Sequence, residues 1–391
     1  MAGAQLHEGM PGSEDLLSAR DRPEEAGWPR VLFLGSEYAG HRTRFRNLQE
    51  TVQRDGRLRA TFRSVTGWRA GGRVERLPLP TAVRGRLRGV AEAASLACLP
   101  RPDVTWTSAS EVLTPFLWAQ LGPLRRPLVL DLDATDGQLE AMAPEYYGRP
   151  EKRGMRRRLA TAQEALLWRS TTIFTPWSNW AAEDLRRRGI ADERIVVLPP
   201  GVDLDRWAVP CTARGQTERL RLLFVGGDFE RKGGAVLAEL VRGPLAGQFE
   251  LDIVTHGDVE PGPNVRVHRA EPNSAALLSL FARADLFVLP TRAECFGIAA
   301  VEAMAAGLPV IMGNTGGARD IVVQGETGWL IPPRGPELLA ALAQAWGERN
   351  RLPAMGAAGR RRAEKCFDGR ANDGAIIDLI ERLARDRRHR A

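Results

Sequence analysis

Short apolar runs rich in β-branched residues recur along the chain, and stretches long enough for a helix separate them. This alternation is typical of βαβ units, in which helices connect parallel strands. The runs form two series. The first series comprises residues 31–34, 60–65, 104–107, 128–132, 172–175 and 195–198. The second comprises residues 220–225, 249–254, 265–268, 286–289, 309–312 and 329–331. We therefore predict an α/β fold with two parallel sheets.

The break between the two series lies near residue 200, where Pro199-Pro200-Gly201 interrupts any regular element. A chain of 391 residues is also longer than one hydrophobic core usually serves, so two domains are expected. The predicted divisions are an N-terminal domain at 30–200, a linker at 201–218, a C-terminal domain at 219–370, and a helix with a basic tail at 371–391. Residues 1–29, rich in acidic and turn-forming residues, are predicted to be a disordered leader.

Composition narrows the class of protein. No apolar stretch approaches the roughly 18 residues that a membrane-spanning helix needs. The four cysteines and five histidines lack the spacing of a disulfide framework or a zinc site. We expect a cytoplasmic protein with no bound metal and no other cofactor.

The net charge of +7 has two interpretations. The arginines could attract nucleic acid or an anionic membrane, or they could form an ordinary solvated surface. Residues 83–99 and 152–168 combine basic and apolar side chains, as interfacial helices do, but the same pattern suits a helix packed on its own domain. Peripheral contact with the inner face of the membrane therefore stays open, and no specific nucleic-acid partner is expected.

Two glutamates mark the most informative segment, residues 289–310. A strand there leads into a short loop that carries Glu294, and a helix begins near Gly297 and carries Glu302 in its second turn. Unpaired amides at a helix start bind anions, and a glycine allows close approach. Two surface glutamates on an amphipathic helix are the alternative, but Glu302 is the one polar residue in an otherwise apolar run, which favours a functional role.

A glycine-rich turn is the second informative segment. Gly226 and Gly227 follow a strand, and Arg231 and Lys232 precede the next helix. Backbone amides and two cations at such a turn suit a diphosphate, whose negative charge grows as the bond to it breaks. An ordinary surface loop is the alternative, because one glycine-rich turn is a weak signal.

Together these segments resemble the retaining, nucleotide-sugar-dependent glycosyltransferases of family 4 (glycosyl transferases group 1). The resemblance rests on the order of four C-terminal motifs: VGG-x-x-x-RKGG, E-x7-E with Phe-Gly, Thr-Gly-Gly at 315–317, and GETGWL at 325–330. In the N-terminal half it rests on Ser178 and on PPGVD at 199–203. It implies the GT-B fold, in which two Rossmann-like domains face a central cleft and the C-terminal helix returns to the N-terminal domain.

The resemblance also implies residue roles on the donor side. Arg231 and Lys232 would contact the diphosphate, Glu294 the donor sugar, and Glu302 the ribose. Further donor contacts would come from Gly226, Gly227 and the amides of Phe296, Gly297 and Ile298. The family often has Gly-Arg where this chain has Gly226-Gly227, so Arg231 is expected to carry more of the phosphate charge.

Acceptor contacts are expected at the carboxyl ends of N-terminal strands, where ligands gather in such sheets. The candidates are Gly40 and His41 after the first strand, and Asp131 and Asp133 with Asp136 around the fourth. A surface-loop role for His41 is the alternative. The Asp131-Leu-Asp133 pattern resembles a metal-binding D-x-D, but its place at a strand end favours a cleft-facing or capping role.

The function expected from the resemblance is transfer of a sugar, as in a hexosyltransferase of carbohydrate biosynthesis, from a UDP- or GDP-linked donor to an acceptor hydroxyl with retention of configuration. The acceptor, whether glycan, lipid-linked or small molecule, is not defined by the sequence. Two alternatives stay open: a sugar-nucleotide epimerase or hydrolase on the same scaffold, and a noncatalytic protein that binds polyanions or membranes.

Overall fold

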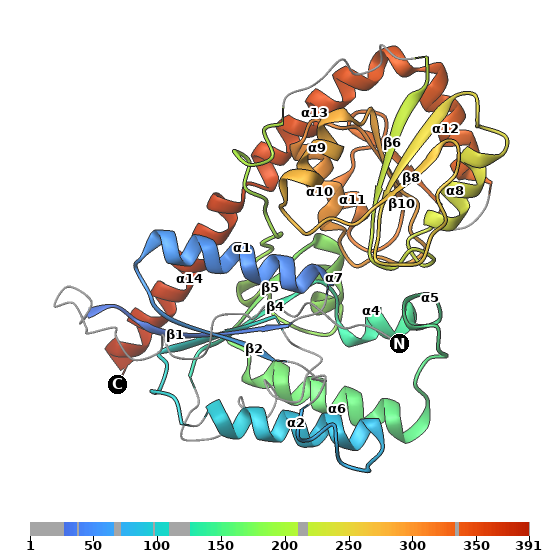
Figure 1. Ribbon diagram of the computed structural model, residues 1–391. Coiled ribbons are helices and arrows are strands. Elements are labelled where there is room, and N and C mark those ends of the chain that lie inside the picture. Colours follow the sequence, from blue (N-terminus) through green and yellow to red (C-terminus); the bar gives the residue numbers. More distant parts are fainter. Residues whose placement is uncertain are drawn as a thin grey trace, which may run out of the picture.

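A computed structural model describes residues 27–36, 39–65, 72–96, 98–108, 126–209, 218–332 and 336–390. Two parallel sheets, each flanked by helices, form two domains that contact each other across a central boundary (Figure 1). The α/β class and the two-domain GT-B arrangement are confirmed, and eleven of the twelve predicted strand runs form strands.

The N-terminal sheet has five strands in the order β2-β1-β3-β4-β5. They are β1 (Arg30–Ser36), β2 (Arg59–Val65), β3 (Val104–Thr107), β4 (Leu128–Leu132) and β5 (Ile173–Pro176). The described helices of this domain are α1 (Ala39–Asp55), α2 (Thr81–Leu96), α4 (Asp136–Ala141), α5 (Ala143–Tyr147), α6 (Gly154–Ser170), α7 (Asn179–Arg187) and the 3₁₀ turn η3 (Asp192–Arg194). The helix α1 covers one face of the sheet, whereas α2 and α6 lie on the opposite face (Figure 1).

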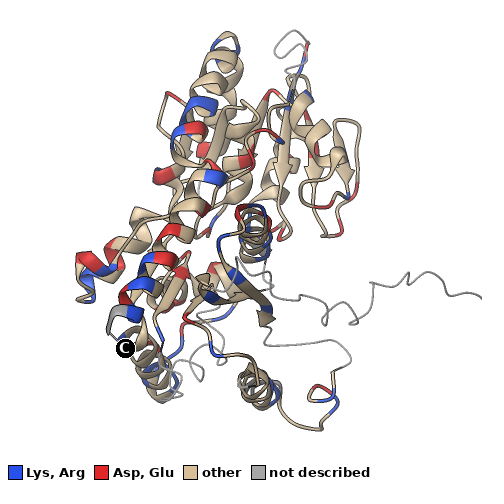
Figure 2. Cartoon of the chain, turned by 90° about the vertical axis from the view of Figure 1, so that its left-hand side faces the viewer, with Lys and Arg blue, Asp and Glu red and all other residues tan. Residues whose placement is uncertain are grey.

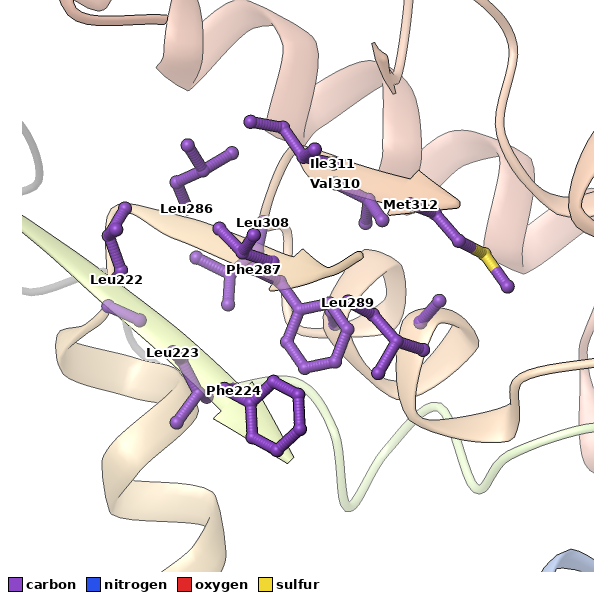
Figure 3. Packing of buried hydrophobic residues seen from close by; sticks show 14 of the residues in the cluster. Leu222, Leu223, Phe224, Leu286, Phe287, Leu289, Leu308, Val310, Ile311 and Met312 are labelled. Atoms are coloured by element: carbon purple, nitrogen blue, oxygen red, sulfur yellow. The ribbon is translucent and has the colours of Figure 1, made fainter. Parts of the chain in front are cut away.

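The C-terminal sheet has six strands in the order β11-β10-β9-β6-β7-β8. They are β6 (Leu220–Val225), β7 (Phe249–Val254), β8 (Val265–His268), β9 (Leu286–Leu289), β10 (Val310–Gly313) and β11 (Gly328–Ile331). The described helices are α8 (Gly234–Arg242), α9 (Ala275–Arg283), α10 (Ile298–Ala305), α11 (Ala318–Ile321), α12 (Glu337–Gly347), η4 (Arg349–Arg351), α13 (Leu352–Cys366) and α14 (Gly369–Arg390). The central strands are apolar on both faces, as parallel strands between two helical layers must be, and Figure 3 shows their side chains interdigitating.

The predicted strand at residues 195–198 is wrong. The segment lies beside β5 and donates two backbone hydrogen bonds to it, from Val196 to Phe174 and from Leu198 to Pro176, but it forms only a single isolated bridge. A parallel ladder needs bonds in both directions, and Pro176 has no N–H with which to return one. The proline that ends β5 therefore prevents a sixth strand here.

The helix α14 returns to the N-terminal domain and packs along α1, as the resemblance implies (Figure 1). Its Ile376, Ile377 and Ile380 are buried in the same core as Phe33 and Trp106 of the N-terminal sheet. The N-terminal domain therefore obtains part of its core from the end of the described chain.

The chain crosses between the domains at two adjacent places. Val202 pairs with Asp368, and Gly369 packs so closely on Gly201 that a Cβ on Gly201 would lie 2.4 Å from the Gly369 Cα. Val202 and Trp207, which fall in the predicted linker, pack in the C-terminal core, and residues 210–217 of that linker lie outside the described residues.

A buried charge network fixes α14 to the N-terminal domain. Arg44 on α1 is fully buried and forms ion pairs with Asp373 of α14 and, at 3.7 Å, with Asp131 of β4. Asp373 also accepts a hydrogen bond of 3.1 Å from Thr51. Burial raises the pKa of both carboxyl groups, and the positive charge of Arg44 opposes that rise.

Candidate active site between the two domains

The glycine-rich turn between β6 and α8 places two cations at the domain boundary. Lys232 Nζ lies 2.7 Å from Oε2 of Glu294, and both side chains are largely buried. Gly226 leaves room for the lysine, because a Cβ there would lie 2.6 Å from Lys232 Cδ. Gly227 has open space around it. The turn ends at Gly233 in the left-handed region, which only glycine enters at little cost.

Glu294 lies in the loop that connects β9 with α10, and this loop is tightly packed. Gly316 has a φ of 56°, and a Cβ on it would lie 1.9 Å from the Glu294 carbonyl oxygen. Gly297 at the start of α10 also has a positive φ of 102°, and no side chain caps the helix there. The first amides of a helix have no intrahelical acceptor, so the start of α10 offers donors to an anion. Phe296 and Ile298 flank Gly297 at this point, with Phe296 buried.

Glu302 is buried inside α10, with only 6% of its surface exposed. Loss of solvent raises its pKa to about 8, and the nearby positive charge of Lys232 partly opposes the rise. A carboxyl group with this pKa is mostly protonated at neutral pH, and it can then donate as well as accept a hydrogen bond.

Arg231 is held in place by contacts from both domains. Its guanidinium donates to Asp228 at 3.0 Å and to the carbonyl of Ala293. The ring of Tyr146, from α5 of the N-terminal domain, lies 4.4 Å from the guanidinium carbon. The predicted donor residues Arg231, Lys232 and Glu294 are thus brought together.

The N-terminal wall of this site contains His41 and Asp133. His41 Nε2 lies 3.2 Å from Asp133 Oδ1, and the His41 ring packs 4.7 Å from the ring of Trp177. Asp133 also receives a hydrogen bond from Cys295, the neighbour of Glu294. Burial would raise the pKa of Asp133, but the charge and hydrogen bond of His41 and the bond from Cys295 lower it below the usual value.

Gly40 lies beside the first turn of α10. A Cβ on Gly40 would lie 3.6 Å from the Ile298 side chain. The structure therefore brings Gly40, His41 and Asp133 to the C-terminal domain, next to the donor residues.

Asp131, predicted as an acceptor contact, is instead fully buried. It accepts hydrogen bonds from Thr175 at 2.8 Å and Trp177 at 2.6 Å, besides the ion pair with Arg44. Asp131 lies within β4, whereas Asp133 follows the last residue of that strand and contacts His41 and Cys295. Asp136 begins α4 and lines a separate cavity of about 330 Å³ beneath α6.

Sequence reasoning missed Tyr146, Trp177 and Cys295. The Trp177 ring contacts the Phe296 ring edge-on, with 6.0 Å between their centres. Because Trp177 directly follows β5, and ligands gather at the carboxyl ends of such strands, its position in the sequence could have identified it. Tyr146 carried no such signal, because it lies in a short helix with no motif. Among the described residues, no group of three or more His, Cys, Asp or Glu side chains is arranged to hold a metal ion.

Two family models match the chain. "Glycosyl transferases group 1" matches residues 247–362, and "Glycosyl transferase 4-like domain" matches residues 25–201. The chain belongs to the family 4 glycosyltransferases of the GT-B fold. In this GT-B glycosyltransferase the first family model covers Glu294 and the helix α10 with Glu302. The second family model covers His41 and Asp133.

Individual relatives agree with this family. The D-inositol 3-phosphate glycosyltransferase of Xylanimonas cellulosilytica is 33% identical over 239 residues, which are 53% of this chain and 56% of that protein. The chain spans about half the length of the curated relatives it matches.

Solved structures agree on the fold. Sucrose-phosphate synthase from Thermosynechococcus elongatus has a TM-score of 0.69 at 19% identity, covering 91% of this chain and 99% of that one. HepE of Anabaena in complex with UDP-glucose has a TM-score of 0.65 at 16% identity, covering 90% and 99%.

Proposed function

We propose that this GT-B protein transfers a glycosyl group from a UDP- or GDP-linked sugar to an acceptor hydroxyl, with retention of anomeric configuration. One observation carries the proposal: Lys232 and Glu294 are paired at 2.7 Å beside Arg231, next to the start of α10, which no side chain caps. This arrangement offers cations and amide donors for a diphosphate, and a carboxylate beside them for a sugar.

Departure of the diphosphate is the step that these groups would assist. As the bond from the sugar to the diphosphate breaks, negative charge accumulates on the phosphate oxygens. Lys232, Arg231 and the amides at the start of α10 are fixed in position before that charge develops, so they stabilise it without reorganisation. The three protein contributions could neutralise the leaving group without a metal ion.

Glu302 is suited to recognise the ribose. A ribose presents two neighbouring hydroxyl groups, each both donor and acceptor. A carboxyl group that is protonated near neutral pH, as burial makes Glu302, can pair with both kinds of site. Glu294, with its oxygen held by Lys232, remains available to accept a hydroxyl hydrogen bond from the donor sugar.

Retention can be explained by a front-face reaction. Glu294, the carboxylate expected at the donor sugar, is paired with Lys232 at 2.7 Å, which makes it less available as a nucleophile. The leaving diphosphate itself could accept the proton of the acceptor hydroxyl on the same face of the sugar. His41 and Asp133 line the opposite wall, where they could orient that hydroxyl.

A thermal-shift series with UDP-, GDP-, ADP- and TDP-sugars tests donor binding, because a ligand far above its dissociation constant stabilises the fold by a few kcal/mol. UDP-glucose is the first choice, since the Anabaena protein of similar fold was solved with it. The stabilising donor is then incubated with glycan, lipid and small-molecule acceptors, and NMR coupling constants give the product's anomeric configuration.

The outcomes separate the alternatives. Transfer to an acceptor with the donor's configuration supports the proposal. Loss of donor to water alone indicates a hydrolase, and isomerised nucleotide sugar indicates an epimerase. Stabilisation by none of the nucleotide sugars removes the proposal.

A further inference from the structure

Exposed apolar side chains are concentrated on one part of the molecule. In the described ranges, eleven large apolar residues are exposed, and nine of them lie between residues 77 and 166 of the N-terminal domain. These nine are Leu77, Leu79, Val83, Leu87, Val90, Tyr147, Met155, Leu159 and Leu166. Only Val236 and Leu339 lie in the C-terminal domain. Scattered exposed apolar residues are normal, but a concentration of this kind indicates an interaction surface.

The residues on α2 and α6 form a stripe on each helix. Met155, Leu159 and Leu166 recur at helical spacing, while Leu167 and Trp168 on the other side of α6 are buried. On α2, Val83, Leu87 and Val90 recur in the same way, while Ala93 and Leu96 are buried. Each stripe therefore faces away from the sheet that its helix covers.

Both helices lie on the same face of the N-terminal sheet, at the end of the molecule farthest from the C-terminal domain (Figure 1). Figure 2 shows the same two helices at the foot of the chain, with basic positions along them. We call this surface, made by the exposed residues of α2 and α6, the basal surface. It lies apart from the residues of the candidate active site, so it is not the donor or acceptor site.

Charge accompanies the apolar stripes. The α2 sequence holds three arginines and one glutamate, and residues 152–170 hold six basic residues and one glutamate. These two segments together carry a net charge of +7, which equals the net charge of the whole chain. On α6, Arg156, Arg157 and Arg158 are exposed beside Met155 and Leu159.

A protein partner, a nucleic acid and a lipid surface would use such a surface differently. Nucleic acid would use the arginines but not the leucines. An apolar protein interface is depleted in charge at its centre. Leucines and methionine in rows, flanked by arginines on the same helix, match the chemistry of a bilayer surface with anionic headgroups, in which the apolar side chains insert and the guanidinium groups contact phosphate.

We propose that the basal surface binds the surface of an anionic lipid bilayer. The helices α2 and α6 lie in the headgroup region, with Leu87 and Leu159 inserted. The exposed arginines of α6 at 156–158 contact lipid phosphates, whereas Arg88 of α2 stays in its ion pair with Glu75. The described helices include none that is long and apolar enough to cross a membrane, so the contact is peripheral. The proposal is independent of the glycosyl-transfer chemistry, because it concerns a different surface.

The test is co-sedimentation of the full chain with vesicles, without donor or acceptor. Vesicles of phosphatidylcholine alone are compared with vesicles that also contain phosphatidylglycerol, over a series of salt concentrations. Met155→Ser/Leu159→Ser removes apolar side chains, and Val236→Ser/Leu339→Ser is its matched control on the other domain. Arg156→Gln/Arg158→Gln removes charge, and Arg361→Gln/Arg382→Gln is the control at exposed arginines elsewhere.

We expect binding to the anionic vesicles only, weakened by salt, and reduced about tenfold or more in both α6 variants but in neither control. Thermal melts and sedimentation of each variant accompany the assay. Absence of vesicle binding by the wild-type chain overturns the proposal. So does a wild-type dimer that Met155→Ser/Leu159→Ser dissociates, which assigns the surface to a second copy. Lowered melting temperature of the α6 variants with unchanged vesicle binding assigns it to packing within the chain.

Discussion

The ring of Tyr146 covers the guanidinium of Arg231, with 4.4 Å between the ring centre and the guanidinium carbon. Tyr146 belongs to α5 of the N-terminal domain, whereas Arg231 belongs to the cationic turn of the C-terminal domain. One domain therefore orients a cation that the other domain presents. The position of Arg231 in the candidate site depends on how the two domains meet.

Replacement of the tyrosine should weaken donor binding. Tyr146→Leu removes the ring. The Arg231 side chain is largely buried, and a cation–π contact of this kind contributes about 1–2 kcal/mol, so the donor KM should rise about five- to thirtyfold. Tyr146→Phe keeps the ring and should retain wild-type KM. Steady-state kinetics with the donor identified by thermal shift measure both. Equal KM values for all three proteins would show that the ring does not orient Arg231.

Removal of Lys232 should reduce turnover strongly. Lys232→Ala deletes a cation placed for the developing phosphate charge, and loss of one such group typically costs about a hundredfold in kcat. Lys365→Ala, at an exposed lysine of α13, is the matched control and should be silent. Far-UV circular dichroism verifies that both variants fold. Wild-type activity in Lys232→Ala would remove the diphosphate role from the turn.

Glu302 should make stability depend on pH. Its pKa is about 8 in the folded protein and near 4.5 when solvated, so the folded state holds a proton that the unfolded state releases between these values. Stability is therefore highest below pH 4.5 for this group and declines as pH rises toward 8. The free energy of unfolding of Glu302→Gln, relative to that of the wild type, should therefore increase by on the order of 3–5 kcal/mol when the pH is raised from 4.5 to 9. Urea unfolding at several pH values measures the difference, and parallel curves for the two proteins would contradict it.

Asp373 should be critical for stability. Asp373→Ala leaves the buried Arg44 with Asp131 as its remaining ion-pair partner, and breaking a buried ion pair costs about 3–5 kcal/mol. Asp378→Ala, which removes an exposed partner of Arg57 on the same helix, should cost less than about 1 kcal/mol. Urea titrations of both variants measure the loss of unfolding free energy. A similar small loss in both would mean that the network does not hold α14.

The architecture could be predicted because parallel strands buried on both faces leave continuous apolar runs in the sequence, such as residues 222–225 and 286–289. The failure at residues 195–198 has a local cause outside that segment. Its own residues suit a strand, but Pro176 on the neighbouring strand cannot donate the returning bond. The hydrophobic pattern of one segment does not reveal which residues lie on the adjacent strand.

The site residues that could be predicted are those with a local motif around them. Lys232 lies in a glycine-rich turn, and Glu294 lies in a separate loop that is followed by Gly297. Contacts between residues of the two domains could not be predicted from the sequence. The pairing of Asp133 with Cys295 and of Tyr146 with Arg231 joins positions distant in sequence, and no local pattern encodes such a distance. Asp131 and Asp133 were predicted to share one role, but Asp131 is buried in β4 and pairs with Arg44, whose second partner Asp373 lies on α14.

The order of synthesis gives α14 a further importance. The ribosome makes the strands of the N-terminal domain first and the isoleucines of α14 only after the whole C-terminal domain. Until then the face of the sheet around Phe33 and Trp106 is covered by α1 alone, and Arg44 lacks Asp373. Part of the apolar surface of the N-terminal domain therefore stays exposed, where chaperones can bind it, until α14 has been synthesised.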